Sequence, residues 1–200
     1  TSGPGLRIRY ATAAGTVSGN MIGVNASGTA ALANQGAGIE LHNLSAGVTV
    51  DNNVSSGNAG SGVNIYQALG VTLTNNKIGT NASGTSGIGN GSAGLVVSCA
   101  GPLSVSGNVI SSNAQYGGYL SGVTGSTFVG NFIGTAADGM SPLANAGPGI
   151  SLNSTACGPS LRDPGLEPKA VKVAVQNVFD GNVVAHNNGD GFFIWGGTGN

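Results

Sequence analysis

The sequence carries very little charge, since only 6% of its 200 residues are Asp, Glu, Lys or Arg. Six basic and seven acidic residues give a formal net charge of -1. A nucleic-acid or anionic-membrane surface needs a cluster of Lys and Arg. The composition therefore argues against both kinds of partner.

Long apolar runs and helical periodicity are also missing. No stretch of 18 apolar residues is present, and no hydrophobic core of a signal peptide is found. We therefore expect no membrane insertion. The chain opens and stops within repeating units, which predicts that it is a segment of a longer protein.

Glycine is abundant, with 38 residues, but it lacks the spacing of every third residue that collagen requires. A hydrophobic fraction of 40% is also too high for a disordered chain. These two observations predict a packed core and a chain with many tight turns.

A short phrase, Ser18-Gly19-Asn20-Met21-Ile22, recurs along the chain. Its copies are centred on Asn20, Asn53, Asn76, Asn108, Asn131 and Asn182. The steps between these asparagines are 33, 23, 32, 23 and 51 residues (53-20, 76-53, 108-76, 131-108, 182-131). Regular periods of this length indicate a solenoid.

Each repeat contains three short stretches of alternating apolar and polar residues, which is typical of β-strands. We therefore predict an all-β fold, a parallel β-helix solenoid of about 6–7 coils, in which 23-residue coils alternate with coils of 32–33 residues. Residues 1–200 form one β-helix segment in this prediction. Residues 155–173 exceed the repeat and are predicted to form an inserted, protruding loop.

The six asparagines are expected to stack as a structural ladder at one corner of the coil. Side-chain amides can bond to the neighbouring coil, and asparagine tolerates left-handed backbone conformations. Three residues before each asparagine, an inward column is predicted: Val17, Val50, Leu73, Val105, Phe128 and Phe179. This corner is therefore interpreted as structural.

The long coils carry an extra phrase at 22–34, 78–90 and 133–145. These three segments, which we call the tongues, are predicted to form a row along one edge of the solenoid. They contain almost no acidic residues, so a row of calcium sites is not expected. No metal site and no cofactor is predicted anywhere in the chain.

The phrases at 107–113 (Gly-Asn-Val-Ile-Ser-Ser-Asn) and 131–139 (Asn-Phe-Ile-Gly-Thr-Ala-Ala-Asp-Gly) resemble those of right-handed parallel β-helix repeat proteins, of the bacterial secreted and surface type within the pectate-lyase-like superfamily. The resemblance implies that the parallel β-helix solenoid is right-handed. It also implies an extracellular or cell-surface location. It does not select a function, because this scaffold carries lyases, hydrolases, adhesins and fibres.

Catalytic candidates are few. His186 and Asp190, beside Asp163 and Glu167 of the insertion, form the best cluster, which would suit a polysaccharide lyase or glycoside hydrolase. Asp51 and Asp180 share a column but lie four coils apart, about 19 Å, which is too far for a glycosidase pair. For His186 and for His42, which has no evident acidic partner, a surface or turn position is the simpler interpretation.

Binding is predicted on the outward face of the first strand of each coil, where two columns run along the solenoid. The first column is Arg7, Glu40, Asn64, Val96, Leu120, Ser151 and Phe193, and the second is Arg9, His42, Tyr66, Ser98, Gly122, Asn153 and Trp195. Tyr66, Phe193 and Trp195 could stack on sugar rings or be covered by another coil or subunit.

A second outward face is rich in hydroxyl groups. Its Thr-x-Thr-like ranks resemble those of ice-binding β-helices, although only Thr72 and Thr74 match fully.

Cys99 and Cys157 are the only cysteines, and both follow a first strand. They lie two coils apart, about 9.6 Å, so a disulfide requires the insertion to bend back. We predict such a bond, pinning the insertion.

The sequence favours a non-catalytic structural β-helix of an extracellular adhesin, sheath or filament, whose partners are further coils or other copies of the protein. The alternative is a domain that binds or cleaves polysaccharide, and ice binding is a minor alternative.

Overall fold

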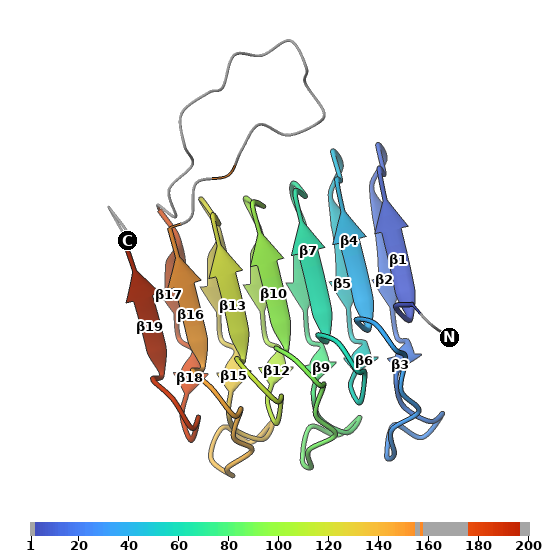
Figure 1. Ribbon diagram of the computed structural model, residues 1–200, viewed down its shortest axis with the longest axis vertical. Helices are drawn as coiled ribbons and strands as arrows, with labels where there is room; N and C mark the ends of the chain where they lie inside the picture. Colours follow the sequence, from blue (N-terminus) through green and yellow to red (C-terminus); the bar gives the residue numbers. More distant parts are fainter. Residues whose placement is uncertain (1–2, 155–156, 158–175, 197–200) are drawn as a thin grey trace.

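The computed structural model describes residues 3–154, 157 and 176–196, and in these residues it contains β-strands and no helix. The strands form three parallel sheets, which we call A, B and C (Figure 1). Sheet A contains β1 (Leu6–Arg9), β4 (Ile39–His42), β7 (Val63–Tyr66), β10 (Leu95–Ser98), β13 (Gly118–Ser121), β16 (Ile150–Asn153) and β19 (Phe192–Trp195). Sheet B contains β2 (Gly15–Ser18), β5 (Val48–Asp51), β8 (Thr72–Thr74), β11 (Ser104–Ser106), β14 (Thr127–Val129) and β17 (Val178–Asp180). Sheet C contains β3 (Met21–Ile22), β6 (Val54–Ser55), β9 (Lys77–Ile78), β12 (Val109–Ile110), β15 (Phe132–Ile133) and β18 (Val183–Val184).

Each coil passes through sheets A, B and C in turn, and neighbouring coils pair in parallel. In sheet A, for example, Leu6 pairs with Ile39 and Ile8 with Leu41. Alternate residues point inward in strands such as β4 and β7, where Ile39, Leu41 and Ile65 are fully buried. The predicted all-β parallel solenoid is therefore confirmed.

The inward column of sheet B matches the prediction, because all its members belong to the core or pack against it. Phe128 and Phe179 stack with ring centroids 4.8 Å apart. That distance is close to the spacing of paired strands. Burial of this column supplies part of the hydrophobic stabilisation that holds successive coils together.

The predicted outward columns of sheet A are wrong by one residue in β13. Gly118 pairs with Ile150, so it takes an inward position, and Leu120 is fully buried. Tyr119 and Ser121 are the outward residues there, while Gly122 lies in the following turn. Two consecutive glycines caused the error, since Gly117 and not Gly118 starts this repeat. A side chain at 118 would collide with the end of Ile150, which fills the space.

The six asparagines form a continuous ladder. Each side-chain amide donates to the side-chain oxygen of the next asparagine at 2.8–3.0 Å, in the order Asn20, Asn53, Asn76, Asn108, Asn131 and Asn182. The four inner members are buried. Since an unpaired buried amide is costly, the ladder fixes the register of one coil on the next.

The backbone part of that prediction is wrong, because the ladder asparagines do not have positive φ. The left-handed residue is the one immediately before each of them: Gly19, Asn52, Asn75, Gly107, Gly130 and Gly181. The preceding residue makes the sharp turn, and the ladder asparagine is free to point its amide along the solenoid axis.

A second asparagine ladder, which the sequence analysis missed, lies at the corner between sheets C and A. It runs through Asn34, Asn58, Asn90, Asn113, Asn145 and Asn187, with amide-to-oxygen distances of 2.9–3.0 Å. Its members stand 5 residues after the first ladder in short coils (58-53, 113-108, 187-182) but 14 in long coils (34-20, 90-76, 145-131). In long coils the tongue lies between the two ladder asparagines, so their separation in sequence is not constant and the second ladder was not recognised.

Candidate functional site

The outward face of sheet A carries the three predicted binding residues, and all are exposed: Tyr66 by 39%, Phe193 by 42% and Trp195 by 69%. The register places Tyr66 four strands from Trp195. At about 4.8 Å per strand this is roughly 19 Å. Phe193 and Trp195, both on β19, lie on one side of the strand. The structure therefore brings two of the three together and leaves Tyr66 apart.

A tyrosine pair at β13 of the same sheet was missed by the sequence analysis. The rings of Tyr116 and Tyr119 lie with centroids 5.4 Å apart. The Asn153 amide donates to the Tyr119 hydroxyl at 3.1 Å. Tyr119 shares a column with Phe193, two strands away. Correct placement of the glycine pair would have revealed this residue.

The N-terminal end of the face holds a small charged cluster. Arg7 donates to the Glu40 carboxylate, and His42 Nε2 lies 3.6 Å from the other Glu40 oxygen. The expectation that His42 has no acidic neighbour is thus wrong. Burial lowers the pKa of His42 more than Glu40 raises it, and its ring meets the edge of Tyr66 with centroids 5.7 Å apart. The exposed ion pair between Arg7 and Glu40 contributes about 1 kcal/mol or less to stability.

The candidate catalytic pair is not assembled by the described residues. His186 is exposed, with φ of 59°, at the turn position that Gly57 and Ser112 occupy in other short coils. Asp190 is also exposed, and among the described residues no hydrogen bond or ion pair joins the two side chains. Asp163 and Glu167 lie outside the described residues.

Asp51 and Asp180, which the sequence analysis judged too far apart for a glycosidase pair, lie apart in the structure as expected. Asp51 accepts bonds from the Thr74 hydroxyl at 2.8 Å and the Asn75 amide at 3.1 Å, and Asp180 is four strands away in sheet B. Within the described part of the chain, no group of three or more His, Cys, Asp and Glu residues could hold a metal ion.

Cys99 and Cys157 form a disulfide in the structure, with 5.4 Å between their Cα atoms. Cys157 passes beside the coil between them, since its sulfur lies 3.7 Å from the Gly122 backbone oxygen. The chain after β16 therefore bends back across one coil, which is the path that the spacing required. Of the predicted insertion, residues 155–156 and 158–173 lie outside the described residues.

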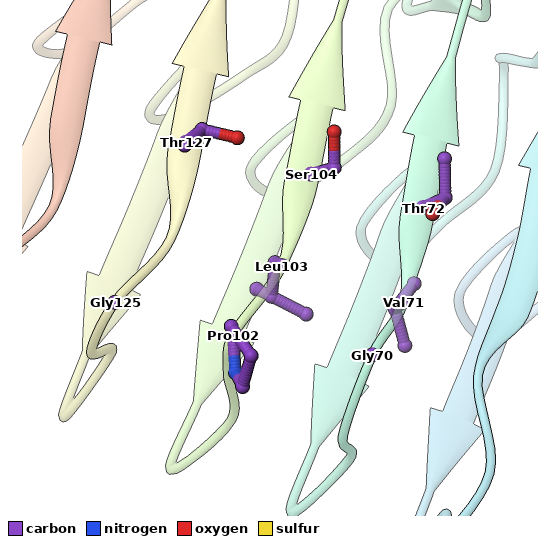
Figure 2. Close-up of a pocket in the computed structure, with 8 residues that line it drawn as sticks. All are labelled: Gly70, Val71, Thr72, Pro102, Leu103, Ser104, Gly125 and Thr127. Carbon is purple, nitrogen blue, oxygen red and sulfur yellow. The ribbon is translucent and has the colours of Figure 1, made fainter.

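The outward face of sheet B carries hydroxyl groups and a shallow open groove. The groove is lined by Gly70, Val71, Thr72, Pro102, Leu103, Ser104, Gly125 and Thr127, which come from three neighbouring coils (Figure 2). The outward columns of hydroxyl residues on sheet B are not continuous, because Val129 and Val178 occupy two of their positions. In addition, the Thr74 hydroxyl already donates to Asp51.

The three tongues fold over the outward side of sheet C. Each closes with an antiparallel bridge: Val24 to Ala31, Thr80 to Gly87 and Thr135 to Pro142. Their tips bond directly, since Ala82 N–H donates to the Gly28 oxygen at 3.0 Å and Ala137 N–H to the Gly84 oxygen at 2.9 Å. The tongues therefore add another line of hydrogen bonds along the solenoid.

One side-chain oxygen holds the turn of each tongue, but the third tongue uses a different position. Asn25 and Asn81 accept from backbone N–H groups four and five residues later. In the third tongue the equivalent position is Ala136, and Asp138 accepts from Met140 and Ser141 instead. A carboxylate thus replaces an amide.

Acid is expected to loosen the third tongue alone. Hydrogen bonds from the Ser141 hydroxyl and from the N–H groups of Met140 and Ser141 lower the pKa of Asp138 from 3.8 to about 2. Because the folded pKa is depressed, this stabilisation is complete above the ordinary pKa and is lost as pH falls from 3.8 towards 2. An NMR titration should show the Met140 and Ser141 amide signals shifting in this window.

The substitution Asp138→Asn is the matched control, because asparagine already holds the other two turns without titrating. Its amide signals should stay constant through the same acid range. An unchanged acid transition in this variant would contradict the assignment to Asp138.

No helix capable of crossing a membrane is found in the part of the chain that the structure describes. In comparisons with known proteins, the family described as "Right handed beta helix region" matches residues 1–133. Comparisons with curated proteins and with solved structures give no match.

Proposed function

Since the chain belongs to the right-handed β-helix family, which its match over residues 1–133 establishes, we propose that it is a non-catalytic structural element of an extracellular surface protein. It would act as a stiff rod in an adhesin, sheath or filament. Its partners would be further coils or other copies of the protein.

The observation that carries this proposal is the continuity of the hydrogen-bonded lines that run along the solenoid. Two asparagine ladders connect successive coils, and the bonded tongue tips connect every second coil. Buried side-chain networks of this kind restrict the movement of one coil against another. A low charge and a regular stack of coils also suit a rod that joins others end to end.

Three acidic side chains that could otherwise serve chemistry are engaged in contacts within the scaffold. Glu40 pairs with Arg7, Asp51 bonds Thr74 and Asn75, and Asp138 holds a tongue. These contacts support a structural reading of three of the seven acidic residues in the sequence.

Electron microscopy of the native surface protein tests the proposal. We expect thin, straight rods or filaments in which the β-helix repeats along the axis. A parallel assay with neutral and uronate polysaccharides should show no turnover. Turnover that disappears in His186→Ala or Asp190→Asn would overturn the structural proposal and assign catalysis to that pair.

Polysaccharide binding on sheet A is the second candidate, favoured by the aromatic side chains of that face. Tyr119 and Phe193 share one column, and Trp195 stands beside Phe193 with 69% of its surface exposed. Aromatic rings of this kind stack on the apolar faces of sugar rings. Retardation in polysaccharide gels that is lost in Tyr119→Ala and Trp195→Ala, but kept in Asn64→Ala, would support this candidate.

A further inference from the structure

The groove on sheet B has the chemistry of a ligand site that neither the scaffold role nor the aromatic face uses. We infer that it binds a short, neutral oligosaccharide. The site lies on a different sheet from Tyr119 and Trp195, so it stands or falls independently of both proposed functions.

The hollow arises because one position lacks a side chain in two of three successive coils. Gly70, Pro102 and Gly125 all stand two residues before an outward hydroxyl residue of sheet B. A Cβ added at Gly125 would meet only the Pro102 Cβ, at 4.0 Å, and one added at Gly70 would meet only the backbone of Gly47. The Pro102 ring therefore lies between Gly70 and Gly125 of the two neighbouring coils, which have no side chain at this position (Figure 2).

Three hydroxyl groups line the groove in one row. Thr72, Ser104 and Thr127 are paired neighbours on β8, β11 and β14, so they repeat at about the strand spacing of 4.8 Å. Among the described residues, none of the three side chains makes a hydrogen bond. A hydroxyl both donates and accepts, so the row can match a ligand that presents hydroxyls of its own.

The charge of the lining selects the class of ligand. No Asp, Glu, Lys, Arg or His lines the groove, so a phosphate or uronate would find no counter-charge there. A wholly apolar ligand would leave the row of hydroxyls without partners, which is unfavourable. A neutral sugar satisfies both conditions, because its hydroxyls meet the row while its C–H face packs on the Pro102 ring.

Amide chemical-shift mapping of the whole protein tests the inference. The probes are soluble cello-, malto-, xylo- and N-acetylchito-oligosaccharides, with oligogalacturonate as the charged comparison. We expect at least one neutral probe to shift the amides at 70–72, 103–104 and 125–127, and oligogalacturonate to shift none of them. The absence of such shifts with every neutral probe would overturn the site, as would shifts confined to sheet A.

A hydroxyl-free variant sharpens the test. Combining Thr72→Val, Ser104→Ala and Thr127→Val removes the three hydroxyl groups and leaves the shape of the groove nearly unchanged. This variant should bind the oligosaccharide at least about tenfold more weakly. The matched control combines Thr16→Val and Thr49→Val on the same sheet outside the groove, and should bind like the unaltered protein. Ser104→Tyr fills the groove and should also abolish binding. Unchanged affinity in the hydroxyl-free variant, with a native-like spectrum, would refute the inference.

Discussion

Replacing Asn108 by alanine is expected to lower the free energy of unfolding by about 3–5 kcal/mol. The side-chain oxygen of Asn108 accepts from the backbone and side chain of Asn76, each at 2.9 Å. Its amide donates to the Leu73 and Ser106 backbone oxygens and to Asn131. Asn108 is fully buried, so no water can replace these bonds without entering the corner. Urea unfolding followed by circular dichroism measures the loss.

The first member of the same ladder provides the control. Asn20 is exposed, and its amide donates to Ser18 and Asn53. Water can take over these bonds, so Asn20→Ala should cost about 1 kcal/mol or less. Equal losses in the two variants would show that burial of the ladder does not determine its contribution.

The second large effect is expected for Gly79→Ala, at about 4 kcal/mol or more. Gly79 has φ of 89°, which an L residue adopts only with strain. In addition, an added Cβ would lie closer than 3.0 Å to the Ser111 backbone oxygen and the Asn113 side-chain oxygen. Asn113 belongs to the second ladder, so the collision falls on a buried and fully bonded corner. Thermal and urea unfolding measure the effect.

Gly130→Ala separates strain from collision. Gly130 has φ of 62°, but a Cβ there would meet nothing within 4 Å. This variant should therefore cost only about 1–2 kcal/mol, the strain alone. If Gly79→Ala proves no more destabilising than Gly130→Ala, close packing of Gly79 against the second asparagine ladder does not contribute to stability.

Asn108→Ala and Gly79→Ala both disturb an asparagine ladder, and the ladders are the feature that supports the proposed function. A rod must resist sliding between coils, and each asparagine corner blocks sliding because a shift by one residue would separate every amide from its acceptor. The tongues add to this resistance on sheet C, where the side chains of Lys77 and Phe132 lie so close to Gly84 and Gly139 of the tongues that a Cβ added at either glycine would crowd them. Burial lowers the pKa of Lys77.

The repeat of the asparagine phrase and the alternating stretches around it were sufficient to predict the parallel solenoid, the three strands of each coil and the inward column of sheet B. These features depend on periodicity, and periodicity is directly visible in a sequence. The same reasoning located the exposed residues Phe193 and Trp195, because outward positions follow from alternation along a strand.

Register was predictable only where a single marker glycine began the repeat. At Gly117-Gly118 two markers were possible, and the choice depended on whether the Ile150 side chain fills the space beside 118. That contact lies one coil away in space and 32 residues away in sequence (150-118). Tyr119 was therefore missed as a surface residue.

The sequence by itself determined a solenoid of stacked coils, since its repeat specifies the strands and the first ladder. Only the tertiary structure decided which residues meet between coils. The second ladder, the bonded tongue tips and the groove beside Pro102 all join residues from different coils. Their positions depend on how insertions of different length are accommodated at the corners, and that is settled by packing and hydrogen bonding in three dimensions.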